Sequence, residues 1–168
     1  MKGLEIGDKI VYPMHGAGII AGVETNEIGG VTKSYYVLKM PMGNLKLMLP
    51  VDKINDIGLR SIIDSSKVAD VKATLKGKPE FLVGSWNKRY HATLERLKTG
   101  DILDAAAVAR NLSAQNVRKK LSSGERRLFD LARQILISEL VFACEKPPEE
   151  IEQWLDELLG MTEETENA

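Results

Sequence analysis

The spacing of apolar residues changes near residue 60, and this change constrains the fold more than any other feature of the sequence. Before residue 60, short β-branched runs end at proline or glycine, which is typical of antiparallel strands joined by tight turns. After it, apolar residues recur at helical spacing. The sequence therefore predicts an α+β protein with two domains, a small SH3-like β-barrel over residues 1–58 and a compact all-α domain over residues 61–160. An acidic, disordered tail is expected at residues 161–168.

Four or five strands are expected in the first domain, four of them at residues 9–12, 18–24, 33–40 and 44–49, with a glycine turn at 28–30. In the fourth strand, Leu45, Leu47 and Leu49 share one face and should fill the barrel. Met48 then points outward. An exposed methionine is either an ordinary isolated apolar residue or part of an adaptable protein-docking surface.

Capping residues divide the second half of the chain into helices. Ser85, Asp101 and Ser122 stand where N-caps are expected, and Ser122 has Glu125 three residues later, which completes a capping box. The predicted helices run from Ser65 or Ser66 to about residue 75, and over 86–98, 101–112, 122–145 and 149–159, with a short basic helix or extension at 114–121.

The formal net charge of −1 conceals an uneven distribution along the chain. Residues 1–60 carry +1, residues 61–136 carry +7 and residues 137–168 carry −9. A basic stretch of this kind can neutralise DNA phosphates, although such a stretch is more often a solvated helix face.

The sequence contains no recognisable catalytic or metal site. Two histidines, His15 and His91, and the single cysteine, Cys144, are too few for a Cys/His zinc cluster. Residues 15–18 lead into a strand, so they lack the helix N-terminus that a phosphate loop needs. Cys144 is expected to be a buried core thiol. We therefore expect a protein that is not an enzyme, without metal, cofactor or small-molecule substrate.

The same residues indicate the compartment. One cysteine cannot form an internal disulfide, and the N-terminus has no apolar signal region. The longest apolar run, residues 135–144, is interrupted by Ser138 and Glu139 and is too short for a membrane helix. A cytoplasmic protein with no membrane contact is expected.

Trp86 is the most informative aromatic residue. It shares one helical stripe with Tyr90, Leu94 and Leu97, so it belongs either to the core or to the exposed end of that stripe, beside a basic cluster. In the exposed position, the indole can stack on an unpaired base or wedge into the minor groove. The pattern alone leaves both alternatives open.

Five segments together resemble the CarD/CdnL family of bacterial transcription regulators: residues 7–13 (GDKIVYP), 15–18 (HGAG), 35–38 (YYVL), 86–90 (WNKRY) and 121–127 (LSSGERR). The resemblance covers nearly the whole chain; transcription-repair coupling factors carry a module similar to the first part alone. It implies a Tudor-like domain that binds the β subunit of RNA polymerase and a helical domain that contacts promoter DNA. Members of this family stabilise the open promoter complex.

The resemblance also implies roles for individual residues. Trp86 matches a wedge at the upstream fork of the transcription bubble. The family positions that approach the DNA backbone are matched by Lys88, Arg89, His91 and Arg126. Some members have a lysine at the position that His91 matches. The polymerase-binding positions are matched by Asn26, Val37, Met48 and Pro50. Some members have arginine in place of Asn26 and Met48, so a more apolar polymerase interface is expected here.

The expected DNA contact is not sequence-specific, because no recognition helix with base-reading side chains is apparent. The expected location is the bacterial nucleoid, through the polymerase. An alternative is a polymerase-binding adaptor whose helical domain recruits another protein rather than DNA. The acidic final helix with Trp154 and Leu155 favours that alternative.

Overall fold

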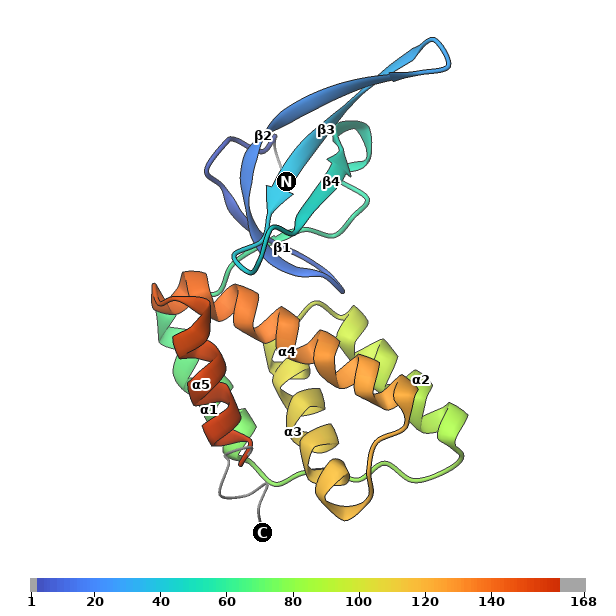
Figure 1. The fold of residues 1–168 in the computed structure, drawn as a ribbon, viewed down its shortest axis with the longest axis vertical. Helices are drawn as coiled ribbons and strands as arrows, with labels where there is room; N and C mark the ends of the chain where they lie inside the picture. The colour runs from blue at the N-terminus through green and yellow to red at the C-terminus, as the bar shows by residue number, and fades with distance from the viewer. Residues whose placement is uncertain (1–2, 161–168) are drawn as a thin grey trace.

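The computed structural model describes residues 3–160 and shows a β-sheet domain above a helical domain (Figure 1). The sheet domain contains β1 (Lys9–Tyr12), β2 (Gly16–Ile28), β3 (Val31–Lys39), β4 (Lys46–Pro50), the 3-10 turn η1 (Val51–Lys53) and β5 (Arg60–Ser61). The helical domain contains the 3-10 turn η2 (Ser65–Lys67), α1 (Val68–Lys76), α2 (Trp86–Lys98), α3 (Ile102–Arg118), α4 (Ser123–Cys144) and α5 (Pro148–Leu158). The predicted α+β architecture is confirmed, and the tail expected at 161–168 lies outside the described residues.

The five strands form one antiparallel sheet with the order β4-β3-β2-β1-β5. A meander whose fifth strand returns beside the first is the arrangement of SH3-like and Tudor-like barrels. A bulge in β2 between Ile20 and Gly22 bends the strand so that this small sheet curves around its own core. That core contains Ile10, Ile20, Leu38, Met40 and Leu49. β5 lies after residue 58, so the sheet continues beyond the boundary expected from the sequence.

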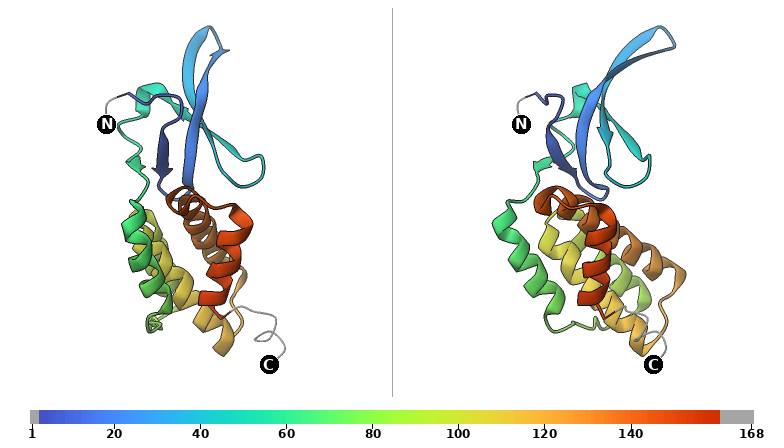
Figure 2. Two further views of the ribbon diagram at one scale, coloured as in Figure 1. Left: turned by 90° about the vertical axis from the view of Figure 1, so that its left-hand side faces the viewer. Right: turned by 60° about the vertical axis from the view of Figure 1, so that its left-hand side comes forward.

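β2 and β3 extend past the other strands as a two-stranded arm that projects away from the helical domain (Figures 1 and 2). At its tip, Ile28 pairs with Val31 across Gly29 and Gly30. Both glycines have positive φ, 60° and 80°, which a two-residue hairpin of type I′ requires. The glycine turn is therefore as predicted.

The fourth strand follows its predicted alternation only in part. Leu49 is fully buried, Leu47 packs against the core, and Met48 is 39% exposed, as expected. Leu45 was expected in the barrel, but it is 43% exposed. It precedes Lys46, where β4 begins, and therefore does not share the strand's alternation.

In the helical domain, α3 packs on α1, α2 and α4. Alanines on α3 allow this close packing: Ala105, Ala106 and Ala109 are all buried. α3 ends at Arg118 rather than at residue 112, so the basic segment after residue 114 extends this helix.

Two expectations about residues of the helical domain are wrong in detail. The cap before α1 is Asp64, whose carboxylate accepts the Ser66 N–H, because the 3-10 turn η2 precedes the helix. At the end of α4, Cys144 is half-buried rather than buried in the core, and burial raises the pKa of its thiol.

Residues of α4 join the two domains, and we call their contacts with the sheet domain the joint (Figures 1 and 2). The hydroxyl of Ser138 accepts the Ala17 N–H at 2.9 Å. The carboxylate of Glu139 accepts hydrogen bonds from both terminal nitrogens of Arg60, each at 2.7 Å, and from the Ile63 N–H at 2.8 Å. Ser138 and Glu139 are both fully buried. The polar residues that interrupt the apolar run of α4 are therefore those that fix one domain to the other.

Among residues 3–160, no helix combines the length and apolar character needed to cross a membrane. Within the same range, no three His, Cys, Asp or Glu side chains converge as a metal ion would require.

Candidate nucleic-acid interface and docking face

Trp86 is the first residue of α2, directly after the N-cap Ser85, whose hydroxyl accepts the Lys88 N–H. Exposure along its helical stripe is graded. Leu97 is 2% exposed, Tyr90 and Leu94 are half-buried, and Trp86 is 40% exposed. The structure thus places Trp86 at the exposed end of the stripe rather than in the core.

The indole is nevertheless held on three sides. One ring face stacks on Tyr90, with centroids 5.0 Å apart and planes inclined by 19°. The indole N–H donates to the hydroxyl of Ser122 at 3.1 Å. The benzo edge lies over Gly124, where an added Cβ would come within 3.0 Å of the ring. We call Tyr90, Ser122 and Gly124 the indole seat.

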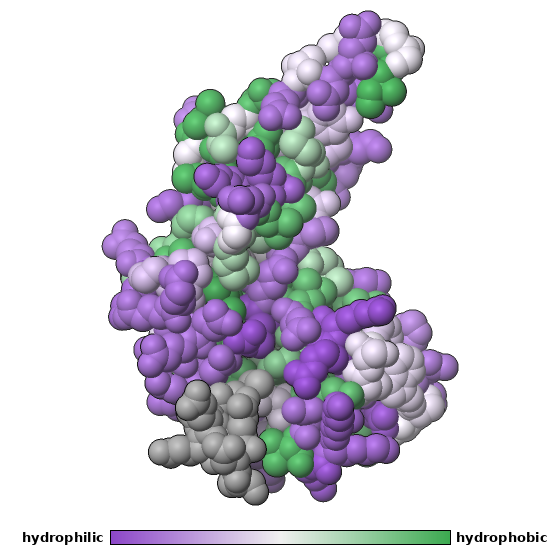
Figure 3. Space-filling model, viewed as in Figure 1, coloured by the Kyte–Doolittle hydropathy of each residue, from purple (hydrophilic) through white to green (hydrophobic). Residues whose placement is uncertain are grey.

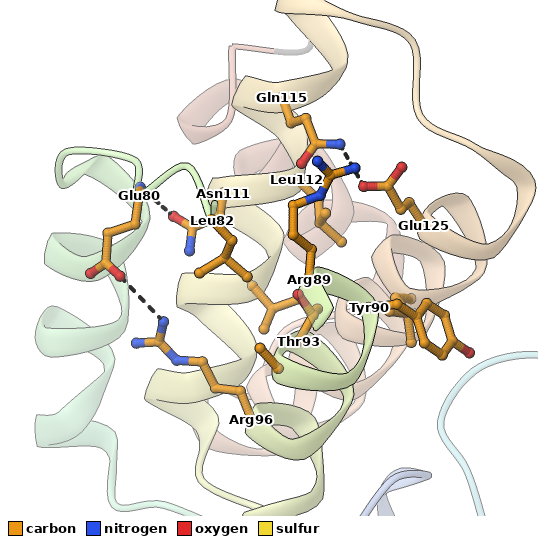
Figure 4. Close-up of a pocket in the computed structure, with 13 residues that line it drawn as sticks. Glu80, Leu82, Arg89, Tyr90, Thr93, Arg96, Asn111, Leu112, Gln115 and Glu125 are labelled. Carbon is orange, nitrogen blue, oxygen red and sulfur yellow. Dashed lines mark hydrogen bonds and ion pairs between the residues drawn. The ribbon is translucent and has the colours of Figure 1, made fainter. Parts of the chain in front are cut away.

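Glu125 orients the serine of this seat. It is buried, and its carboxylate accepts a hydrogen bond from the Ser122 hydroxyl at 2.9 Å. It also accepts one from the Gln115 side chain (Figure 4). Burial raises the pKa of Glu125, but these hydrogen bonds and the charge of Arg89 outweigh it and hold the pKa below its ordinary range. Glu125 is therefore a carboxylate at neutral pH, and the Ser122 hydroxyl hydrogen points toward it.

The predicted DNA-backbone residues have different surroundings. Lys88 and His91 are exposed, and Arg126 is half-buried with its guanidinium 5.8 Å from the Phe129 ring centre. Arg89 is half-buried and points toward Glu125 at the edge of a pocket between α2, α3 and α4 (Figure 4). Part of the Arg89 charge is therefore already balanced within the protein.

Some basic residues of the stretch 61–136 form ion pairs within the helical domain, and others do not. Four of its members bind carboxylates: Arg96, Lys98, Arg110 and Arg133. Within residues 3–160, those that make no ion pair are Lys67, Lys72, Lys76, Lys78, Lys88, Arg89, Arg118, Lys119, Lys120, Arg126 and Arg127. The first four lie on or beside η2 and α1. The other seven lie at the start of α2, at or just after the end of α3 and at the start of α4, and these three helix ends surround the indole seat.

Sequence reasoning missed two features of this region. It identified Ser122 as a cap but not as the partner of an indole 36 residues away. It also did not single out the loop before α2, where Phe81, Leu82 and Val83 are exposed at 44%, 42% and 91%. The low polarity of that loop was the available signal.

The four predicted polymerase-binding residues lie on one face of the sheet, which we call the docking face. Val37 is opposite Met48 in the β3–β4 register, and Asn26 is opposite Lys33, which shares its face with Val37. Asn26 and Met48 are exposed and Pro50 is half-buried, whereas Val37 is only 5% exposed. Val37 thus presents little surface to a partner. The view in Figure 3 shows apolar surface over the sheet domain and a mostly polar helical domain.

The final helix, whose Trp154 and Leu155 favoured the adaptor alternative, packs on its own domain. Leu155 is fully buried, and Trp154 is half-buried with the Lys72 ammonium 5.1 Å from its ring centre. Arg133 on α4 also binds Glu152 and Asp156 of α5. The apolar face of α5 therefore packs on its own domain.

Comparisons with known proteins agree with this arrangement. Residues 4–63 match the family described as CarD-like/TRCF RID domain, and residues 70–156 match CarD, C-terminal domain. The chain is 35% identical to the Bacillus subtilis protein named "Putative transcription factor YdeB" over 136 residues, 81% of this chain and 89% of that one.

Two further similarities concern the first domain. The Bacillus subtilis transcription-repair-coupling factor is 41% identical over 54 residues, 32% of this chain and 4% of that protein. A solved structure described as "CdnLNt from Myxoccoccus xanthus" is 38% identical, covers 38% of this chain and 89% of its own, and superposes with a TM-score of 0.33. With both domains matched in order, the chain belongs to the CarD/CdnL family of transcription factors, and its sheet domain is of the RNA polymerase-interacting type.

Proposed function

We propose that this protein is a non-enzymatic regulator that binds the β subunit of bacterial RNA polymerase and stabilises the open promoter complex. The sheet domain binds the polymerase through the docking face. The helical domain contacts promoter DNA at the upstream edge of the bubble, without reading its sequence. The protein acts in the cytoplasm, on the nucleoid, where the polymerase carries it to promoters.

The observation that carries this proposal is the state of Trp86, which is 40% exposed yet held by the indole seat. A large aromatic side chain in this state loses little conformational freedom when it meets a ligand. The flat ring can stack on an unpaired base or insert at a distorted base step. Trp86 therefore suits a wedge that hinders the separated strands from reannealing.

The surrounding cations support a contact with the DNA backbone. Lys88 and Arg126 make no ion pair within residues 3–160, so their charge is available to phosphates. His91 is exposed, so its ring can donate a hydrogen bond to a phosphate. Arg89 contributes less, because it faces Glu125.

The mechanism is a shift of an equilibrium and needs no covalent step. A protein that binds the open complex more tightly than the closed complex stabilises the open complex by the difference in binding free energy. Docking on the polymerase raises the effective concentration of the helical domain at the promoter, so its DNA contacts can each be weak. The joint holds the docking face and the indole seat in a fixed relation.

Fluorescent promoter DNA tests the contact itself. We would place 2-aminopurine at the upstream edge of the bubble and add the full chain to polymerase–promoter complexes. The wild-type protein should change the 2-aminopurine fluorescence, and Trp86→Ala should not, although polymerase pull-down by this variant is unchanged. Equal fluorescence changes with both proteins would show that Trp86 does not reach the bubble.

A further inference from the structure

We propose that Ser122 is a positioning residue for Trp86: its hydroxyl, oriented by Glu125, holds the indole at the angle at which it meets DNA. This inference rests on the proposed role of Trp86. It adds a function to a residue whose sequence pattern indicates only a helix cap.

The inference starts from the hydrogen bonds of one hydroxyl group. Ser122 Oγ accepts the indole N–H of Trp86 at 3.1 Å and the backbone N–H of Glu125 at 3.2 Å. Its own hydrogen goes to Glu125 Oε1 at 2.9 Å. A serine hydroxyl has one hydrogen and two lone pairs, so these three bonds use its full capacity. The direction of the lone pair that faces Trp86 is therefore fixed.

Glu125 is itself held in place. It is 7% exposed, its other oxygen accepts from the Gln115 amide, and the Arg89 charge lies nearby. A buried, hydrogen-bonded carboxylate has little freedom to move. The chain of contacts thus runs from the core of the helical domain, through Glu125 and Ser122, to an indole that is exposed to solvent.

Gly124 provides the second part of the seat. It lies in the first turn of α4, where alanine would normally favour the helix. A Cβ at this position would approach two indole carbons at 3.0 and 3.3 Å, so the ring would have to move by a few tenths of an ångström. Gly124 therefore leaves space for the indole where a helix alone would favour alanine.

Ser122→Gly separates positioning from capping. Glycine is a tolerated N-cap, so the helix loses little, but the indole loses its acceptor. Ser122→Thr keeps the hydroxyl and serves as the conservative rescue. Asp101→Gly is a matched control, because Asp101 caps α3 through the Leu103 N–H and lies beyond the end of α2 that is opposite Trp86.

The experiment has two measurements on the full chain. The first is the ¹⁵N–¹H resonance of the Trp86 indole, in a Trp154→Phe background so that Trp86 is the single tryptophan. The second is the lifetime of open promoter complexes formed with bacterial RNA polymerase holoenzyme. For Ser122→Gly we expect a shifted indole resonance with faster hydrogen exchange. We also expect a lifetime shortened about fivefold, the effect of losing one neutral hydrogen bond.

Ser122→Thr should restore both measurements, and Asp101→Gly should change neither. Gly124→Ala should shift the resonance and shorten the lifetime without loss of thermal stability. An unchanged indole resonance in Ser122→Gly would overturn the inference. If Trp86→Ala shortens the lifetime of the open complex, a shifted resonance with an unchanged lifetime in Ser122→Gly would also overturn the inference. If Trp86→Ala leaves the lifetime unchanged, the proposed function has failed, and the resonance alone decides whether Ser122 holds the indole.

Discussion

The ion pair between Arg60 and Glu139 joins the two domains, and we predict that its two partners respond unequally to removal. The Glu139 side chain is 0% exposed, whereas that of Arg60 is 30% exposed. In Glu139→Ala, Arg60 keeps its bonds to the carbonyls of Gly100 and Ser61 and can turn toward water. In Arg60→Ala, Glu139 keeps only the Ile63 N–H and remains buried.

The magnitude follows from this difference in burial. Removing one partner of a buried pair costs about 3–5 kcal/mol when the remaining charge cannot reach water. We expect Arg60→Ala to lower the free energy of unfolding by this amount. Glu139→Ala loses the same ion pair but leaves a charge that water can solvate, so we expect a loss of about 2 kcal/mol, near the value for one charged hydrogen bond. The double variant should resemble Glu139→Ala, because neither charge is then orphaned.

Urea denaturation of the full chain measures these values. Both tryptophans lie in the helical domain, so their fluorescence follows that domain, while far-ultraviolet circular dichroism follows the whole chain. The reasoning is refuted if Glu139→Ala is at least as destabilising as Arg60→Ala, or if the double variant shows the sum of the two single effects.

Three other predictions concern the docking face, a DNA-backbone residue and the buried Glu125. Met48→Glu places a charge on the docking face and should abolish polymerase pull-down, whereas Val23→Glu, at an exposed position on the opposite face, should not. Lys88→Ala should reduce the salt dependence of binding to forked DNA, by a slope of about 0.7–0.9 in a plot of log K against log salt; Arg133→Ala, whose charge is already paired, should leave this slope unchanged. The pKa of Glu125 is held below its ordinary range, so its ionised form stabilises the fold at neutral pH, and this contribution is lost as the pH falls through the folded-state pKa. Urea denaturation over a series of acidic pH values should therefore show a steeper loss of stability for the wild type than for Glu125→Gln, and parallel curves would contradict the assignment.

The features that could be predicted from the sequence are those set by neighbouring residues. Gly29 and Gly30 specify their turn because few other residues adopt positive φ at both positions. Ser122 and Glu125 specify the start of α4 because their side chains bond to backbone groups within three residues. Leu45 was misplaced because an alternating pattern does not show where a strand begins.

The features that could not be predicted depend on contacts between distant segments. Ser138 and Glu139 looked like an interruption of an apolar run, and their partners, Ala17 and Arg60, lie in the other domain. The bond from Trp86 to Ser122 spans 36 residues in the same way. Two buried polar residues side by side in an apolar helix were nevertheless a usable signal, because such residues are buried only where they have partners.

The central claim is that Trp86 stabilises the open promoter complex. The most direct test is the lifetime of that complex after challenge with a competitor, with wild-type protein and with Trp86→Ala at concentrations that saturate the polymerase. Loss of stacking on one base predicts a lifetime about 5- to 150-fold shorter with the variant, from about 1–3 kcal/mol per stacked base. An equal lifetime with both proteins, at equal occupancy of the polymerase, would contradict the account.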